Sequence, residues 1–536
     1  MKSQLIEAGY CLDSTTNVWG RPDYKGIAYS DGDEVEERIA AVVSKATDLT
    51  VLSAELRRHC TDWPSLYHLD GNRANILRPF QDMLAGANVL ELGAGCGSIT
   101  RYLGECGATV LAVEGSPRRA AIARSRSRDL ANISVVADRF DTFESKTQFD
   151  FVIMIGVLEY ANLFTKGEDP PGAMLARAKS LLTPTGRLIV AIENQLGLKY
   201  FAGVPEDHLG VPMYRIEGRY GKDQPKTFGR ATLTRLLQNS GFANIEFLVP
   251  FPDYKLPVSI ITEEGTGSHD FDAAAFAWQS VIRDRQTAPY YHFSLEVAWP
   301  IIFHNRLVLD LANSFLIVAS NQKGRAVNDG VLAYHYSTGR KPTYCKETVF
   351  TKGDSGNIKV AYRRLGRSEG DTENDKLVEL VCPDHDVYRL GALLSREFVE
   401  IVTRDGWTVG QVSQFMRRYL DIVEQVAHEQ GVKGDFLSPL LILPSTLFDV
   451  IPQNIIIHEN DTFSLIDNEW EARFPLELGY LLFRALFAST NSVISFGQPA
   501  SGTMTYGELF ESVLAEVGVQ MTSGGLRRYM EMEQKV

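Results

Sequence analysis

A glycine-rich turn between two apolar segments constrains this chain more than any other feature. The first segment, 89–92, is apolar except at Glu91 and leads into three closely spaced glycines, Gly93, Gly95 and Gly97. The second, 109–113, ends at Glu114. Glycines let the backbone approach a ligand where a Cβ would clash, and an acid at the tip of the next strand can accept both hydroxyls of a ribose. Together they predict a pocket for a cofactor that carries adenosine.

The spacing of the glycines indicates which adenosine cofactor is bound. A nicotinamide site reads G-x-G-x-x-G and presents the N-terminus of a helix to a pyrophosphate. Here position 98 is Ser, and the turn reads Glu-x-Gly-x-Gly-x-Gly from Glu91 to Gly97. This pattern resembles motif I of class I S-adenosylmethionine (SAM)-dependent methyltransferases. The resemblance implies that Glu91 and the glycines lie beside the methionine part of SAM, and that Glu114 binds its ribose.

Further apolar segments follow at spacing similar to that of the family. They are the expected third strand at 134–138, the fourth at 149–155, the fifth at 186–192, and two last strands at 245–249 and 257–262. Helical or mixed segments separate the first five, as repeated βα units in a parallel sheet require. We therefore expect an α/β fold with a Rossmann-like, seven-stranded methyltransferase sheet. The resemblance implies that Asp138 contacts the adenine amino group. A doubly wound domain with an unused glycine turn is the alternative.

Two side chains are candidates for the base of methyl transfer. A base is needed only if the acceptor is a hydroxyl or an amine that must lose its proton. Glu159 follows the fourth strand, and His208 lies in a long glycine-, proline- and aromatic-rich segment, 193–228. A loop this long inside a compact domain is usually a lid or a binding loop. Pairing within the next helix for Glu159, and solvation for His208, are the alternatives. Three tyrosines could line the acceptor site: Tyr160, Tyr214 and Tyr220.

Charge and composition exclude several classes of protein. The net charge of −13 argues against general nucleic-acid binding, which needs a basic surface. The arginine-rich segment 118–128 is interpreted as a solvated helix face. The six cysteines form no C-x-x-C pair, which argues against a zinc site or a disulfide framework. No apolar run is long enough to predict a transmembrane segment, and the N-terminus lacks a signal-peptide pattern, so we expect a cytoplasmic protein.

A second group of polar residues lies in the C-terminal half. Asp449 and Asn454 precede an apolar strand, and Asp467 follows in an Asp-x-Glu context. The spacing resembles the catalytic segment of protein-kinase-like phosphotransferases, and most closely that of small-molecule kinases. In such enzymes one Asp accepts the substrate proton, while an Asn and a second Asp hold magnesium on the phosphates of ATP. The resemblance implies Asp449 as the base, and Asn454 and Asp467 as metal ligands. Lys346 is the first candidate for the lysine that holds the phosphates, and Lys359 is the alternative.

The kinase pattern is incomplete in this chain. Leu447 and Phe448 replace the His and Gly that usually precede the base, and no glycine-rich phosphate loop precedes the strands of this half. An active kinase and a kinase-like fold that lost its activity are therefore both open.

The order of the two halves resembles bacterial enzymes of surface-polysaccharide biosynthesis that join a methyltransferase to a kinase and cap O-antigen chains. The resemblance implies a small-molecule or glycan acceptor, with methyl transfer to a sugar hydroxyl or a phosphosugar. A lipid, quinone or protein acceptor, with a non-catalytic C-terminal scaffold, is the alternative. We expect an N-terminal helical extension at 1–69, a SAM-dependent methyltransferase domain at 70–265, a connecting apolar region at 266–330 and a kinase-like α+β domain at 331–536.

Overall fold

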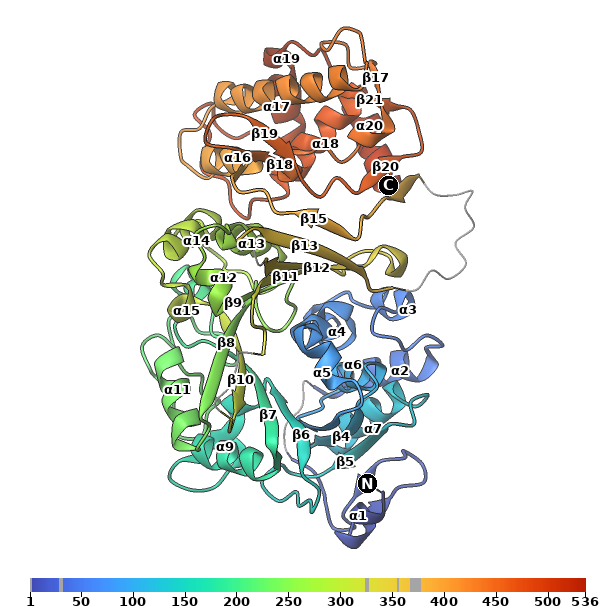
Figure 1. Cartoon of the computed structure of the whole chain (residues 1–536), viewed down its shortest axis with the longest axis vertical. Helices are drawn as coiled ribbons and strands as arrows, with labels where there is room; N and C mark the ends of the chain where they lie inside the picture. Colours follow the sequence, from blue (N-terminus) through green and yellow to red (C-terminus); the bar gives the residue numbers. More distant parts are fainter. Residues whose placement is uncertain (1, 28–31, 323–326, 354–355, 367–376) are drawn as a thin grey trace.

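The computed structural model describes residues 2–27, 32–322, 327–353, 356–366 and 377–536. Three layers of structure follow one another along the long axis of the molecule (Figure 1). A mixed α/β unit with the N-terminus lies at one end, an antiparallel sheet lies in the middle, and a mainly helical unit with the C-terminus lies at the other end.

The α/β unit contributes seven neighbouring strands to a 14-stranded sheet that continues into the C-terminal half. In spatial order its strands are β5 (Ile133–Ala137), β4 (Thr109–Glu114), β3 (Asn88–Leu92), β6 (Phe149–Ile155), β7 (Leu182–Glu193), β10 (Ser314–Ser320) and β8 (Asn244–Phe251). Only β10 runs antiparallel to its two neighbours among these strands. Most of their residues are buried, as expected for strands that are covered on both faces. The predicted α/β fold with a parallel, Rossmann-like arrangement of strands is confirmed, within a sheet that is larger than predicted.

The C-terminal boundary of this unit differs from the prediction. The apolar segment that forms β10 lies in the region predicted to be a connector, 266–330, yet it inserts between β7 and β8. The last of the seven strands along the chain therefore ends at Ser320, and the unit is not complete by residue 265. The predicted last strand, β9 (Ser259–Thr262), lies outside the seven, because it pairs with β8 on one side and with β11 (Val331–Ser337) on the other.

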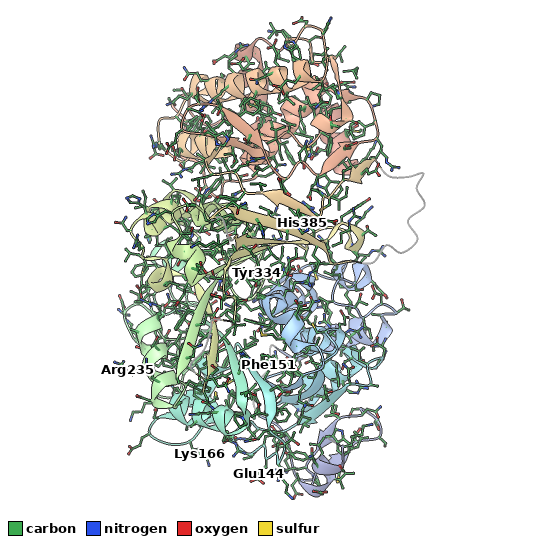
Figure 2. The ribbon with its side chains drawn as sticks, viewed as in Figure 1. Glu144, Phe151, Lys166, Arg235, Tyr334 and His385 are labelled. Atoms are coloured by element: carbon green, nitrogen blue, oxygen red, sulfur yellow. The ribbon has the colours of Figure 1, made fainter. Side chains whose placement is uncertain are left out.

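Helices cover the seven strands. Those that follow the strands are α6 (Ser98–Glu105), α7 (Pro117–Arg126), α8 (Ala161–Phe164), α9 (Pro170–Ser180), α10 (Leu198–Phe201) and α11 (Arg230–Asn239). Helix α6 packs against α7, and α9 packs against α11. Figure 2 shows the side chains that fill the sheet, such as Phe151 of β6, and those that face solvent, such as Arg235 of α11.

The N-terminal extension is only partly helical. Its helices are α1 (Lys2–Glu7), α2 (Asp33–Lys45), α3 (Ala54–Arg57) and α4 (Trp63–Leu69), and α5 (Gln81–Leu84) follows. Two short strands, β1 (Cys11–Leu12) and β2 (Trp19–Gly20), add to the edge of the sheet beside β5. The extension is thus part of the sheet as well as a cover over it.

The arginines of α7 do not form a solvated face. Arg119 and Arg126 are buried. Arg118 forms ion pairs with Asp33 and Glu36 of α2, and a guanidinium N–H of Arg126 donates to the carbonyl oxygen of His68. The arginines therefore fasten the N-terminal extension to the α/β unit, which corrects the interpretation of this segment.

The C-terminal half continues the sheet and adds a helical unit. Strands β11, β12 (Lys346–Lys352), β13 (Ile358–Arg364) and β15 (His385–Val387) extend the sheet beyond β9 in antiparallel order. Helices α12 (Glu263–Gly267), α13 (Ala273–Ser280), α14 (Leu295–His304) and α15 (Val308–Leu311) precede them. The helical unit consists of α16 (Ser395–Val402), α17 (Val409–Glu429), α18 (Leu478–Thr490), α19 (Tyr506–Val517) and α20 (Ser523–Lys535).

Small strands connect the helices of this unit. They are β14 (Val378–Leu380), β16 (Ala392–Leu393), β17 (Ile442–Leu443), β18 (Ile455–Ile457), β19 (Phe463–Leu465), β20 (Trp470–Ala472) and β21 (Leu476–Glu477). The hairpin β18–β19 lies between Asn454 and Asp467 and brings the two ends of this segment together. Among the described helices, none has the length and apolar character that crossing a bilayer requires.

Candidate functional site

The three glycines of the turn after β3 are needed for different reasons. All have a left-handed φ, +79° at Gly93, +55° at Gly95 and +82° at Gly97. A Cβ on Gly93 would lie 2.5 Å from Val157 Cγ2, and one on Gly97 would lie 2.7 Å from Ala123 Cα. A Cβ on Gly95 would meet no described atom within 4 Å. Packing thus requires Gly93 and Gly97, whereas Gly95 faces open space.

Two buried acids lie next to this turn. Glu114 accepts hydrogen bonds from the backbone N–H groups of Gly95, at 2.7 Å, and Ser116, at 2.9 Å. Each carboxylate oxygen keeps a lone pair for a further donor. Glu91 accepts a hydrogen bond from the Thr100 hydroxyl at 2.6 Å. Burial raises the pKa of Glu91 to about 7, and it also raises the pKa of Glu114.

Asp138 ties the N-terminal segment to the same site. Its carboxylate accepts hydrogen bonds from the Tyr10 hydroxyl and from Arg21 Nε, the latter at 3.3 Å. Burial, together with the bond to Asp138, raises the pKa of Tyr10 to about 12. Asp138 lies at the wall of the cavity, so its predicted contact with adenine stays a prediction.

These residues surround a cavity of about 470 Å³. This volume lies in the range of small-molecule sites. The cavity is lined by the glycine turn, by Trp63 and Tyr67 of the N-terminal extension, and by His208 of the long segment 193–228. Both the extension and the long segment therefore help to enclose it. Of the three tyrosines predicted to line the acceptor site, only Tyr160 does so, since Tyr214 and Tyr220 pack on each other.

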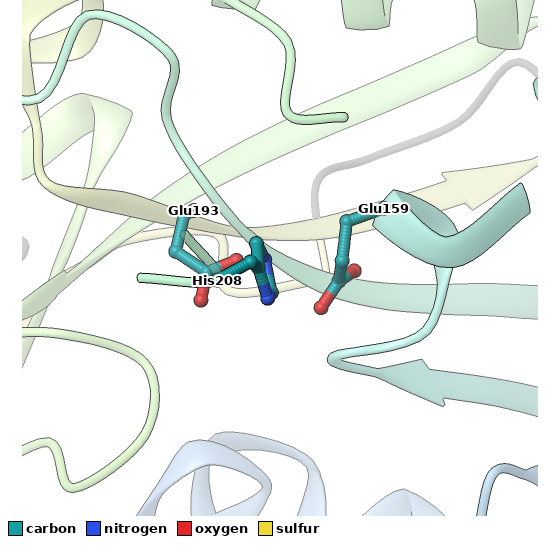
Figure 3. A group of neighbouring side chains, drawn as sticks. All are labelled: Glu159, Glu193 and His208. Carbon is teal, nitrogen blue, oxygen red and sulfur yellow. The ribbon is translucent and has the colours of Figure 1, made fainter. Parts of the chain in front are cut away.

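Glu159, His208 and Glu193 lie close together in the lining of this cavity (Figure 3). One possible ligand atom from each side chain lies within 4.8 Å of the other two. Glu159 and Glu193 are 1% and 0% exposed. Burial, and then the charge of Glu193, raise the pKa of Glu159 well above its usual range. The Glu159 carboxylate also interacts with its own backbone, so capping or pairing in the following helix stays the alternative role for this residue. Glu193 could not be found from the sequence because it ends an ordinary apolar strand.

A buried network of ion pairs supports this end of the cavity. Lys255 Nζ lies 2.6 Å from Glu193 and 2.9 Å from Asp207. Arg215 contacts Asp207 at 2.6 Å, and Lys199 contacts Asp253 at 2.7 Å. Burial alone would lower the pKa of Lys255, but the carboxylates around it raise the pKa well above its usual range. One feature of the sequence indicates this network: charged residues occur within apolar stretches such as Leu198–Phe201.

The C-terminal half brings its four predicted residues together. Lys346 of β12 forms ion pairs with Asp467 and, at 2.5 Å, with Glu469. Asn454 Nδ2 donates to the carbonyl oxygen of Asp449 at 3.0 Å and to that of Asp467 at 3.5 Å. Residue Asp467 has a left-handed φ of +48°. A non-glycine residue in this region is uncommon and marks a constrained position.

The two aspartates of this group have opposite electrostatic surroundings. Burial and the neighbouring Asp467 raise the pKa of Asp449 to about 7. Burial would also raise the pKa of Asp467, but its ion pair with Lys346 lowers it. A second cavity, of about 510 Å³, is lined by Asn454 and Asp467 together with Tyr362 of β13. It also reaches Arg57 and Arg283, which belong to the first half of the chain.

A family model matches part of the first half. Residues 68–246, about a third of the chain, match a model described as "Methyltransferase domain". The matched segment includes the strands β3 to β7 of the α/β unit.

Curated relatives align with parts of the chain. A demethylmenaquinone methyltransferase of Tropheryma whipplei is 33% identical over 106 residues, which cover 20% of this chain and 41% of the relative. A ribosomal RNA small subunit methyltransferase A of Streptococcus mutans is 29% identical over 210 residues, which cover 38% of this chain and 65% of the relative. The chain therefore spans less than two thirds of the length of these relatives.

Solved structures of methyltransferases also align with it. The N-methyltransferase NodS of Bradyrhizobium japonicum, in complex with S-adenosyl-L-homocysteine, is 16% identical with a TM-score of 0.27, covering 42% of this chain and 94% of that one. A SAM-dependent methyltransferase of Thermotoga maritima is 16% identical with a TM-score of 0.26, covering 47% of this chain and 89% of that one.

Proposed function

We propose that the chain is a SAM-dependent methyltransferase. The observation that carries the proposal is the cavity that joins an open glycine turn to a buried acid at the tip of the next strand. The space beside Gly95 accommodates the methionine part of SAM, and Glu114 keeps acceptor lone pairs for the ribose hydroxyls. Bound SAM would supply the electrophilic methyl group. The match of residues 68–246 to a methyltransferase domain supports the same activity.

The protein groups beside the methyl acceptor act on its position and its proton. Methyl transfer is an in-line displacement, so a fixed approach of the acceptor supplies much of the rate. Glu159 and His208 lie together in the lining of the cavity, where either could take the proton of a hydroxyl acceptor.

The acceptor is a polar, hydroxyl-bearing molecule, of which a sugar or phosphosugar is the main candidate. Glu159, Glu193 and His208 line the acceptor end, with Asp207 and Lys255 around them. Buried charges favour a ligand that can form hydrogen bonds, and they disfavour an apolar ring or chain, which would leave them unpaired. This argues against a quinone or lipid acceptor, although the Tropheryma whipplei relative is named for a quinone substrate.

Calorimetric titration with SAM tests the cofactor. The full-length chain should bind SAM, and Glu114→Ala should lose most of the heat of binding, whereas Glu105→Ala on α6, beyond the cavity, should retain it. Unchanged affinity in Glu114→Ala would refute the assignment.

Incubation with labelled SAM and a panel of glycan, quinone and RNA acceptors would then identify the acceptor class.

We propose a second activity, phosphotransfer, for the C-terminal half. Lys346 comes from a distant strand and pairs with Asp467 of the segment that also holds Asp449 and Asn454, and Asn454 and Asp467 line the second cavity. Asn454 and Asp467 would hold Mg²⁺ on the phosphates of ATP, and Asp449 would accept the substrate proton. Nucleotide binding in the presence of magnesium, followed by thermal unfolding, tests this. Absence of an ATP-dependent shift would favour a non-catalytic scaffold.

A further inference from the structure

Three side chains at the acceptor end of the first cavity have buried polar atoms without a partner. They are Glu159 Oε2, Glu193 Oε2 and His208 Nε2, and none of them has a hydrogen-bond partner among the described residues. Buried polar atoms in proteins are nearly always paired. Because all three side chains point toward one space (Figure 3), their missing partner is most simply a single bound species.

The three residues are held on separate segments of the chain. Glu159 follows β6 and Glu193 ends β7, and these parallel neighbours bring both carboxylates to the same sheet edge. His208 is held by its backbone N–H, which donates to Glu206 at 2.7 Å. The Tyr160 hydroxyl lies 3.3 Å from His208 Nδ1. A partner on one ring nitrogen fixes the orientation of the other, as is usual for histidines that bind metals.

The charges around this space are unbalanced. Six carboxylates belong to the connected network: Glu159, Glu193, Glu206, Asp207, Asp253 and Asp284. The cations that face them are Lys199, Lys255, Arg215 and the nearby Arg73. With all six acids ionised, as metal binding would require, these ten side chains would carry two more negative charges than positive ones. Burying uncompensated charge is costly, so a ligand with two positive charges would balance the site.

We propose that Glu159, Glu193 and His208 bind a divalent metal ion at the acceptor end of the methyltransferase cavity. Mutual distances within 4.8 Å suit three ligand atoms that surround one ion. Two carboxylate oxygens and one imidazole nitrogen favour manganese, iron or zinc over calcium, which prefers oxygen ligands alone. Tyr160 is the positioning residue for His208.

The metal would change how the acceptor is activated, and this part of the inference rests on the proposed methyl transfer. A hydroxyl that coordinates the ion becomes more acidic and loses its proton to water. Its oxygen then forms a bond to the methyl carbon, while the methyl–sulfur bond breaks and both its electrons stay on sulfur. Glu159 and His208 would therefore be ligands and would not take the proton themselves.

Manganese binding to the full chain, first stripped with a chelator, tests the inference. Titration followed by electron paramagnetic resonance should show one site that depends on His208. Tyr160→Phe should weaken binding about tenfold, in line with the known cost of removing a partner that supports a metal ligand, and His208→Gln, which removes a ligand itself, should weaken binding by roughly 100-fold or more. His304→Gln, the same change at an exposed position of α14, is the control. Asp467→Asn removes the other candidate site and should leave the His208-dependent one intact.

The outcomes separate this inference from the proposed methyltransferase. Saturable Mn²⁺ binding that is unchanged in His208→Gln and Tyr160→Phe, or no saturable binding of Mn²⁺ or Zn²⁺, would overturn the metal site. If the chain still binds SAM in that case, the proposed function stands without a metal. If Mn²⁺ binds but SAM does not, the methyltransferase proposal fails while the metal site remains. Thermal unfolding of each variant confirms that it is folded.

Discussion

Lys255 Nζ and Glu193 Oε1 lie 2.6 Å apart, and the two side chains are 9% and 1% exposed. This ion pair connects the segment after β8 with the end of β7 beneath the acceptor end of the cavity. Lys255→Met would leave Glu193 and Asp207 without their nearest shared cation. Removing one partner of a buried pair costs about 3–5 kcal/mol, so we expect a marked fall in the unfolding temperature. Lys222→Met, at an exposed position, should be nearly neutral. A fully stable Lys255→Met variant would show that the network is not needed.

Two glycines of the turn should respond differently to the same substitution. Gly97→Ala places a Cβ against the backbone of α7, so it should lower stability. Gly95→Ala meets no described atom and should affect folding mainly through its left-handed φ, at a cost of about 1–2 kcal/mol. Its Cβ would instead occupy ligand space and weaken SAM binding roughly tenfold or more. Calorimetry and thermal unfolding measure the two effects. If Gly95→Ala lost as much stability as Gly97→Ala but bound SAM as tightly as the native chain, the different roles of the two glycines would be contradicted.

The fold of the first half could be predicted where the signal is local. The strands at 88–92 and 109–114 are apolar runs that end in a glycine turn and an acid, and both lie where expected. The position of β10 could not be predicted, because an apolar run does not reveal which neighbours it will pair with. The buried arginines of α7 escaped prediction for a related reason. Arg119 pairs with Glu36 of α2, and Arg126 donates to the carbonyl oxygen of His68 in α4, and both partners are distant in sequence.

The residues of the candidate sites also fall into two groups, those that local spacing predicts and those whose contacts are distant in sequence. Glu91, Glu114 and the three glycines could be found from spacing, since their relationship is set within 25 residues of chain. Glu193 could not, because its role depends on the strand beside it and on a loop that folds back over it. In the C-terminal half the segment 449–469 could be recognised by its spacing. Strand position alone does not single out Lys346, because its ion pairs are with Asp467 and Glu469, which are distant in sequence.

The raised pKa of Glu91 predicts a pH-dependent stability. Burial raises its pKa from 4.5 to about 7 in the folded chain. Below about pH 4.5 the acid is neutral in both states. As the pH rises toward 7 the unfolded state ionises first, so stability falls, and above 7 the difference stays constant. At about 1.4 kcal/mol per pKa unit, ionised Glu91 costs about 3 kcal/mol.

Glu91→Gln should remove this pH dependence. The variant should unfold several degrees above the native chain at pH 7.5, with a smaller difference at pH 5.5, as measured by thermal unfolding. Glu37→Gln, on the exposed face of α2, is the control and should show no such trend. A difference between Glu91→Gln and the native chain that does not grow with pH would mean that Glu91 ionises at an ordinary pH.

Asp449 and Asp467 should separate the binding of nucleotide from the transfer of phosphate. Asp467 pairs with Lys346 and lines the second cavity, so Asp467→Asn should abolish magnesium-dependent binding of ATP. Asp449 lies deeper, 5% exposed, where its carboxylate accepts the backbone N–H of Glu469 at 3.2 Å. Asp449→Asn retains that acceptor, so nucleotide binding should persist while transfer is lost. Equilibrium binding of ATP and release of labelled phosphate to an acceptor measure the two steps. If both variants bind ATP like the native chain, the proposed metal ligands are misassigned; if neither the native chain nor the variants bind it, the C-terminal half is a scaffold.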